Sequence, residues 1–144
     1  MSKVNAFETD ILELIFNNTA LANIGDASGL QPAGTAGSLY IALFTANPDE
    51  AAGVGNEADY TGYARVAVAR SGAGWTIASG QAENAGAVTF GACTAGSDTV
   101  THFAIMTALT GGDMLYYGAL TASLAISTGI TPEFAAGDLT VTED

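Results

Sequence analysis

Residues 99–120 read TVTHFAIMTALTGGDMLYYGAL, and this stretch decides the fold. Two runs rich in β-branched and aromatic residues, at 99–107 and 114–120, flank the turn Thr110-Gly111-Gly112-Asp113. Because glycine adopts positive φ angles at little cost, a Gly-Gly pair between two such runs is typical of a β-hairpin. The sequence therefore predicts two antiparallel strands joined by this turn.

More short β-runs lie outward from the hairpin, separated by turns rich in glycine. The further strands expected from these runs cover residues 39–45, 64–69, 74–78, 82–90, 122–127 and 139–142. A long loop at 46–62 contains Asn47-Pro48-Asp49, and a second loop at 129–137 contains Pro132. Short strands at such close spacing predict a mainly all-β fold, an antiparallel β-sandwich of the jelly-roll type.

A helix is expected before the first strand. The expected helix has Asn5 as its N-cap, with Glu8 in capping-box register, and ends at Asn17 and Asn18. Its four apolar residues at helical spacing are Phe7, Ile11, Leu14 and Ile15. The stretch 21–37, called the arm below, is rich in Gly, Ala, Asn and Ser and is expected to be irregular. We expect the helix and arm (1–37) and the β-sandwich (38–144) to form one folding unit.

The strand at 39–45 is apolar on both alternating faces, which indicates that something covers each of them. The cover could be the N-terminal helix, a second sheet or another chain. We therefore add residues of this strand and four tyrosines to the apolar helix positions as candidates for an interface with other subunits. The candidates are Phe7, Ile11, Leu14, Ile15, Leu39, Tyr40, Ile41, Phe44, Tyr60, Tyr63, Tyr116 and Tyr117.

The charge balance of the chain is strongly acidic. Fifteen acidic residues stand against Lys3, Arg65 and Arg70, which gives a formal net charge of −12 at pH 7. Such a chain repels the phosphates of nucleic acids. Charged residues make up only 12% of the sequence, so a partner could cover wide areas without desolvating ions. The composition favours an assembly component that does not bind nucleic acid.

The sequence shows no pattern typical of a membrane protein. No run approaches the roughly 18 consecutive apolar residues of a membrane-spanning helix. The polar and acidic stretch 1–10 does not resemble a signal peptide. We expect synthesis in a cytoplasm and no membrane partner.

The inventory of reactive side chains argues against an enzyme. His102 is the only histidine and lies within an expected strand, where a packing role is more common than catalysis. One Cys and one His also fall short of a zinc site. Cys93, the only cysteine, is expected to be a small buried hydrophobe, with an interchain disulfide as the alternative. The sequence predicts no catalytic residue and no cofactor.

Acidic residues crowd the loop at 46–62, where Asp49, Glu50, Glu57 and Asp59 lie close together. Calcium takes roughly six to eight oxygen ligands, so these carboxylates are a weak alternative for a calcium site. Their spacing does not match a recognised calcium loop, which favours a solvated acidic loop and no metal. Paired carboxylates also hydrolyse glycosides, but most acids here lie in turns and at the termini, where solvation explains them.

Five blocks stand out in order along the chain: LYIALFTANP (39–48), GYARVAV (62–68), TVTHFAIM (99–106), LYYGAL (115–120) and FAAGDL (134–139). Together with the short helix near the start, they resemble a group of small tailed-bacteriophage virion proteins that are often labelled tail-fibre proteins. The stretch 20–37 is longer and more irregular than in this group. The resemblance implies a non-enzymatic virion protein, made in the bacterial host cytoplasm, that packs on other virion proteins and forms a homo-oligomer.

The place of such a protein in the particle stays open between head and tail. An elongated fibre usually contains repeats or a coiled coil, and the sequence shows neither. We therefore expect a capsid decoration or cement protein that packs on the major capsid protein. Removal of residues 1–37 from this chain should then abolish its incorporation into particles but leave a soluble β-fold. The alternative is a tail, tail-fibre or baseplate component that binds host-surface glycans. Its stacking rings would be Tyr40, Tyr60, Tyr63, Trp75, Tyr116 and Tyr117.

Overall fold

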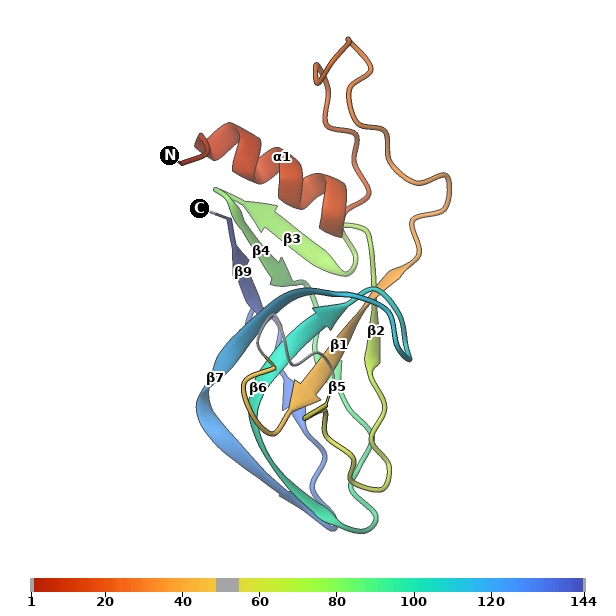
Figure 1. The fold of residues 1–144 in the computed structure, drawn as a ribbon, viewed down its shortest axis with the longest axis vertical. Helices are drawn as coiled ribbons and strands as arrows, with labels where there is room; N and C mark the ends of the chain where they lie inside the picture. The colour runs from red at the N-terminus through yellow and green to blue at the C-terminus, as the bar shows by residue number, and fades with distance from the viewer. Residues whose placement is uncertain (1, 49–54, 144) are drawn as a thin grey trace. The chain divides into compact units, whose positions relative to one another are not determined.

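The computed structural model describes residues 2–48 and 55–143. Within these ranges the chain forms one helix followed by nine strands (Figure 1). The elements are α1 (Asn5–Phe16), β1 (Ser38–Phe44), β2 (Val66–Ala69), β3 (Trp75–Ala78), β4 (Gln81–Asn84), β5 (Val88–Thr89), β6 (Ser97–Met106), β7 (Met114–Ser127), β8 (Glu133–Phe134) and β9 (Thr140–Thr142). The α1 helix is too short to cross a membrane, and the described residues contain no helix that could.

The strands form three sheets, whose orders are β2-β1-β6-β7, β3-β4-β9 and β5-β8. β1 pairs antiparallel with β6 from Tyr40 opposite Met106 to Phe44 opposite His102. β4 pairs antiparallel with both β3 and β9. The prediction of a mainly β, antiparallel fold with one N-terminal helix is confirmed. The sheet order does not confirm the jelly-roll topology, which consists of two facing four-stranded sheets.

The chain divides into two compact units. The first, called the helix unit below, comprises Met1–Ser38, Val68–Ala87 and Phe134–Asp144. The second, called the sheet unit, comprises Leu39–Ala67 and Val88–Glu133. The chain first leaves the helix unit for the sheet unit between Ser38 and Leu39, one residue after the expected boundary between 37 and 38. The helix unit also contains two later segments, because α1 packs against β3 and β4.

The core of the helix unit forms around one end of α1. Leu12 and Phe16 are fully buried, and the ring of Phe16 meets that of Trp75 edge-on with centroids 4.6 Å apart. The two buried residues are four positions apart and so lie on one face of the helix. Neither residue was predicted from the sequence. The four apolar residues that were predicted instead are only half-buried and flank this face.

The start of α1 differs from the prediction. The N-cap is Val4 in an extended conformation, and no side chain caps the helix. Asn5 is already helical, and its carbonyl accepts a hydrogen bond from the Thr9 hydroxyl at 3.0 Å. The predicted capping box of Asn5 and Glu8 is therefore wrong. The predicted end is confirmed, because Asn17 is the C-cap and Asn18 has a φ of 55°.

The predicted hairpin forms the long β6–β7 pair of the sheet unit. Its connection is longer than the expected four residues, since the Thr107 N–H donates to the Asp113 carbonyl at 2.9 Å. Gly111 and Gly112 have φ angles of 62° and 73°, which explains why two glycines are needed there.

Two strand predictions have the wrong bounds. The runs at 114–120 and 122–127 form the single strand β7, which is interrupted by irregular pairing and not by a turn. The run at 82–90 is instead divided between β4 and β5, and β8 lies in the stretch expected to be a loop. Pairing with distant strands sets these bounds, and the local sequence does not contain that information.

Strand β1 is buried on both faces, as the sequence pattern required. Four consecutive residues from Ile41 to Phe44 have almost no exposed surface. On one face Ala42 and Phe44 pack with Ala104 and Met106 of β6. The chain itself therefore covers this strand, and no second chain is needed to explain its composition.

Candidate partner-binding surfaces

The arm leaves the end of α1 and returns to β1 without forming a helix or a strand (Figure 1). Its base is closed by the Asn18 side chain, which exchanges two 2.9 Å hydrogen bonds with the backbone of Ala33. Closer to the tip, the backbones of Leu21 and Leu30 exchange hydrogen bonds of 3.0 and 2.8 Å. The arm is therefore irregular in form but fixed by its own hydrogen bonds.

The tip of the arm is built around a carboxylate turn. Asp26 Oδ1 accepts hydrogen bonds from the backbone N–H groups of Ser28, at 2.7 Å, and Gly29, at 3.1 Å. Gly29 has a φ of 63°, and a Cβ atom there would lie 1.9 Å from the carbonyl oxygen of Leu21. Only glycine fits this close approach, so the sequence of the tip is matched to one backbone path.

The arm presents apolar side chains to solvent. Ile24 and Leu30 are exposed by 42% and 47%, and Asp26 is the only charged residue between 21 and 37. Two exposed apolar side chains on an ordered, nearly uncharged segment offer a surface that a partner could cover without desolvating ions.

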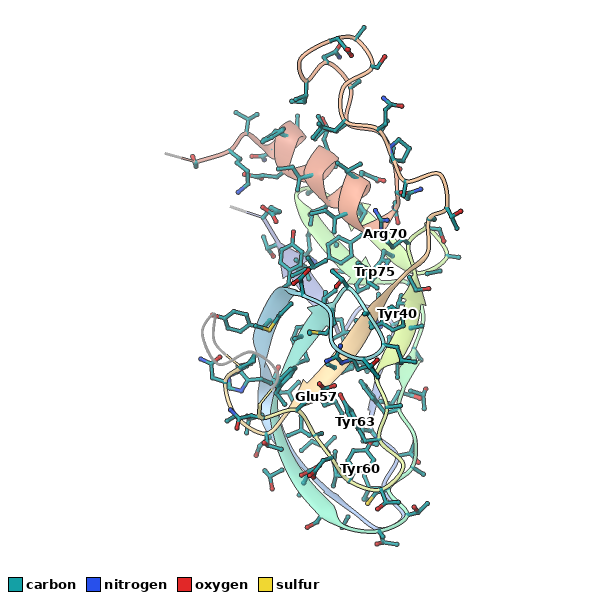
Figure 2. The ribbon with its side chains drawn as sticks, turned by 45° about the vertical axis from the view of Figure 1, so that its right-hand side comes forward. Tyr40, Glu57, Tyr60, Tyr63, Arg70 and Trp75 are labelled. Atoms are coloured by element: carbon teal, nitrogen blue, oxygen red, sulfur yellow. The ribbon has the colours of Figure 1, made fainter. Side chains whose placement is uncertain are left out.

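Arg70 fixes the return of the arm to the helix. Its guanidinium donates to the carbonyls of Ile15 at 2.6 Å, Leu14 at 2.8 Å and Ala36 at 3.1 Å (Figure 2). The first two carbonyls belong to the last turn of α1, where a cation also interacts favourably with the helix dipole. From the sequence, Arg70 was predicted only to contribute charge. Its acceptors lie more than thirty residues away, so no local pattern indicated this role.

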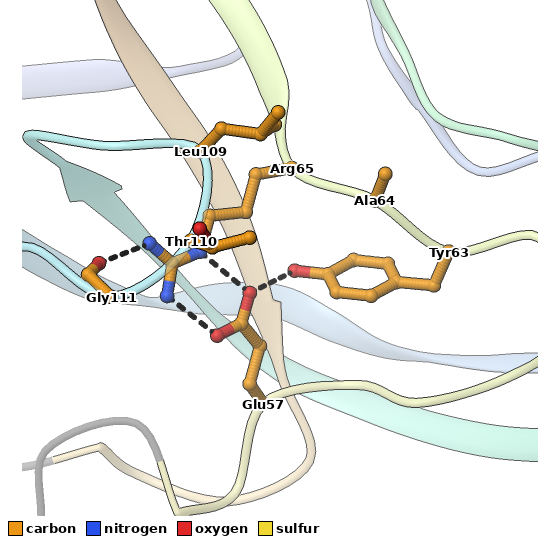
Figure 3. Close-up of a pocket in the computed structure, with 7 residues that line it drawn as sticks. All are labelled: Glu57, Tyr63, Ala64, Arg65, Leu109, Thr110 and Gly111. Carbon is orange, nitrogen blue, oxygen red and sulfur yellow. Dashed lines mark hydrogen bonds and ion pairs between the residues drawn. The ribbon is translucent and has the colours of Figure 1, made fainter.

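The sheet unit contains a cavity of about 390 Å³ lined by Glu57, Tyr63, Ala64, Arg65, Leu109, Thr110 and Gly111 (Figure 3). Arg65 is only 6% exposed and binds both carboxylate oxygens of Glu57 at 2.7 Å. Its Nη1 donates to the carbonyls of Ala108 and Gly111, both at 2.7 Å. Hydrogen bonding to Glu57 raises the pKa of Arg65 above its ordinary value.

Tyr63 completes this cluster. Its hydroxyl donates to Glu57 Oε1 at 2.8 Å and accepts the backbone N–H of Leu43 at 3.0 Å. Burial, together with the Glu57 carboxylate, raises the pKa of Tyr63 above the usual range of a phenol. Arg65 uses four of the roughly five N–H donors of a guanidinium on partners inside the unit. The cluster is therefore a structural clamp, and its charges already neutralise each other.

The calcium alternative finds little support in the described residues. Glu57 is bound by Arg65, and Asp59 is exposed. Asp49 and Glu50 lie outside the described residues. Within 2–48 and 55–143, no three acidic, histidine or cysteine side chains gather as metal ligands would.

The Cys93 thiol is buried, with 1% of the residue exposed. Its sulfur lies 3.4 Å from the carbonyl oxygen of Ala95 and 3.6 Å from that of Gly96. An interchain disulfide requires an accessible thiol, so this conformation does not offer Cys93 to a second chain.

The predicted interface residues have different positions in the structure. Leu39, Ile41, Phe44 and Tyr60 are buried within the chain, because they form its own core. The residues that are partly exposed are Phe7, Ile11, Leu14, Ile15, Tyr40, Tyr63 and Tyr116. Tyr117 is exposed by 41%. Of the proposed stacking rings, Tyr60 and Trp75 are buried, so the six rings do not form one exposed platform.

The comparison with protein families covers all five blocks noted in the sequence. Residues 2–142 match the family model described as podophage GP4 fiber I protein gp80. The chain belongs to this fibre I family. The match includes α1, the arm and every strand. Membership makes the chain a bacteriophage virion structural protein, which associates with other virion proteins, as the resemblance implied. No curated protein matches the chain.

Proposed function

We propose that this fibre I family member is a non-enzymatic structural subunit that docks onto a neighbouring virion protein through its arm. The observation that carries the proposal is the combination of exposure and order in residues 21–37. Internal hydrogen bonds hold the arm in one path while Ile24 and Leu30 stay in contact with solvent.

This combination reduces the cost of binding. Ordering a flexible loop on a partner consumes roughly 0.5–1.5 kcal/mol per immobilised side chain, and a loop that is already ordered avoids part of that cost. The near absence of charge from the arm removes a second cost, because few ions need to be desolvated when a partner covers it. The arm thus resembles a preordered binding segment more than a flexible linker.

The non-enzymatic part of the proposal is supported by what the reactive groups do. Glu57 and Arg65 bind each other, and Cys93 is buried. The His102 ring contacts the Thr101 hydroxyl at 2.8 Å and lies in mid-strand. None of these groups is paired with another in the way that nucleophilic catalysis requires.

For the place in the particle, we infer a fibre. The family description names a fibre, and the described residues contain one short helix and no repeated strand unit, so the chain would supply a module of that fibre and not a repetitive shaft. Decoration of the capsid, which was the main expectation from the sequence, becomes the alternative. Immunogold labelling of intact particles distinguishes the two, since label on a projecting fibre supports the first and label spread over the head supports the second.

Removal of residues 1–37 is a poor test of the arm, although the sequence suggested it. That deletion also removes Leu12 and Phe16 from the core of the helix unit, so loss of incorporation could reflect misfolding alone. A point substitution on the exposed part of the arm avoids this problem.

We therefore suggest Ile24→Asp, with Ile130→Asp as the matched control. Both are isoleucines of nearly equal exposure, 42% and 40%, and only Ile24 lies in the arm. Particles produced with each variant would be purified and the amount of this chain per particle measured. We expect Ile24→Asp to lower incorporation at least tenfold, equivalent to about 1.4 kcal/mol, and Ile130→Asp to leave it near normal. Normal incorporation of a folded Ile24→Asp variant would overturn the role of the arm.

A further inference from the structure

Strand β7 lies at the edge of the four-stranded sheet. In the described part of the chain β6 is the only strand that pairs with β7, and the isolated bridges do not involve it. A strand with one neighbour directs alternate backbone N–H and C=O groups away from the sheet. At 14 residues, β7 is also the longest strand described. Among the described residues, the sheet unit therefore has a long β-edge with no second strand paired to it.

This edge lacks charge, proline and shortness, which are three of the features that prevent edge-to-edge association, while a fourth, a β-bulge, interrupts it between Ala119 and Leu124. Natural edge strands are protected by charged residues, by proline or by being short. Residues 114–127 contain no charged residue and no proline. Their exposed side chains include Leu115, Tyr117 and Leu124, at 42%, 41% and 37%.

We propose that β7 pairs antiparallel with β7 of a second copy of this chain, about a twofold axis, so that the sheet continues across both copies. An antiparallel strand is complementary to itself, since each outward N–H meets an outward C=O of its symmetry mate. Charge also favours this place of contact. Each copy carries a formal charge of −12, and repulsion between copies is least where the contacting segment has no charge. The inference concerns the sheet unit and does not depend on the arm.

The irregular pairing of β7 with β6 fixes which side chains would meet. Ala119 lies opposite His102 and Leu124 opposite Val100, so β7 advances five residues while β6 advances two. His102 and Val100 are two residues apart in β6 and therefore share a face of the sheet. Their partners in β7, Ala119 and Leu124, lie on the same face. Tyr117, two residues before Ala119, lies on it too. Pairing centred between Leu120 and Thr121 places Tyr117 of one copy opposite Leu124 of the other, on the same side of the joint sheet. An aromatic ring opposite an aliphatic side chain is a favourable cross-strand pair.

Sedimentation of the purified chain tests the proposal. We expect a monomer–dimer equilibrium that shifts toward the dimer as salt is added, because salt screens repulsion between two acidic copies. Thr121→Glu would place two carboxylates close to the axis and should raise the Kd at least about tenfold. Thr76→Glu is the control, since Thr76 is an exposed residue of the edge strand β3 and gains the same charge. It should leave the Kd nearly unchanged.

Cross-linking supplies a second readout with a milder substitution. Thr121→Cys should form a disulfide-linked dimer under gentle oxidation, whereas Thr76→Cys should not. The native Cys93 is buried and should not form a cross-link in either variant. A chain that remains monomeric at about 100 μM in every salt concentration would overturn the proposal. So would equal cross-linking of the two cysteine variants, or an unchanged Kd in a folded Thr121→Glu variant.

Discussion

Arg65 and Arg70 connect distant segments, one in each unit, but they do so with different partners. Arg65 is almost fully buried and forms a bidentate pair with Glu57 while also holding two carbonyls of the β6–β7 turn. Arg70 is half-buried and donates only to carbonyls, at the end of α1 and the end of the arm. The first clamp contains a compensating charge, and the second does not.

The difference follows from burial. A guanidinium that is removed from water needs a counter-charge, because neutral acceptors alone do not repay its desolvation. One that keeps contact with solvent can bind carbonyls only, with help from the helix dipole. Lys3, the third basic residue, pairs with Glu143 at 3.2 Å. The few cations of this acidic chain are thus used inside its own fold.

The largest effect is expected from Arg65→Met. This substitution leaves the Glu57 carboxylate and two turn carbonyls without their donor, and breaking such a buried pair costs about 3–5 kcal/mol. Urea denaturation would measure the loss. The double variant Arg65→Met with Glu57→Gln should recover part of it, since the uncompensated charge is then absent. Equal stability of the single and double variants would show that Glu57 does not depend on Arg65.

A smaller effect is expected from Arg70→Met, about 1–3 kcal/mol, because water can replace the lost donor at a half-buried site. The matched control is Lys3→Met, which removes the same charge from a surface ion pair and should cost less than about 1 kcal/mol. Hydrogen exchange should also show faster exchange at the end of α1 and in the arm of the Arg70 variant. If Arg70→Met cost as much as Arg65→Met, burial would not explain the contrast between the two clamps.

The smallest effect is expected from Tyr63→Phe, about 1 kcal/mol near neutral pH, from loss of the hydroxyl that bridges Leu43 and Glu57. Its pH dependence is more informative. The pKa of Tyr63 is raised in the folded chain, so above pH 10 or so the unfolded chain binds fewer protons and the free energy of unfolding falls. That fall should be less steep in Tyr63→Phe. Equal slopes for wild type and Tyr63→Phe would contradict the buried phenol.

The parts of the fold that were predicted well have local causes. The β6–β7 hairpin follows from Gly111 and Gly112, which adopt positive φ angles that other residues resist. The end of α1 follows from Asn18 for a similar reason, since asparagine tolerates its φ of 55° better than most residues do. The start of α1 was predicted wrongly because a plausible capping sequence was present but the backbone turned one residue earlier.

The candidate site could be predicted only in part. The arm was recognised from its composition, but its order depends on contacts such as that between Asn18 and Ala33, fifteen residues apart. Asn84 is a sharper case. It is fully buried, donating to the carbonyl of Ala135 at 2.8 Å and accepting the Leu139 N–H at 2.9 Å, and nothing in its neighbourhood distinguished it from a surface asparagine.

The sequence by itself determined the class of the molecule: an acidic, mainly β chain with one helix, whose five blocks indicated a phage virion protein. Composition, periodicity and turn residues are sufficient for this because they act through neighbours along the chain. Only the tertiary structure decided which apolar residues form the core and which face solvent. It buried Ile41 and Phe44 in the core but left Ile24, Tyr117 and Leu124 exposed. The reason is that an apolar side chain does not specify its partner, and burial is settled by segments that meet only when the chain folds.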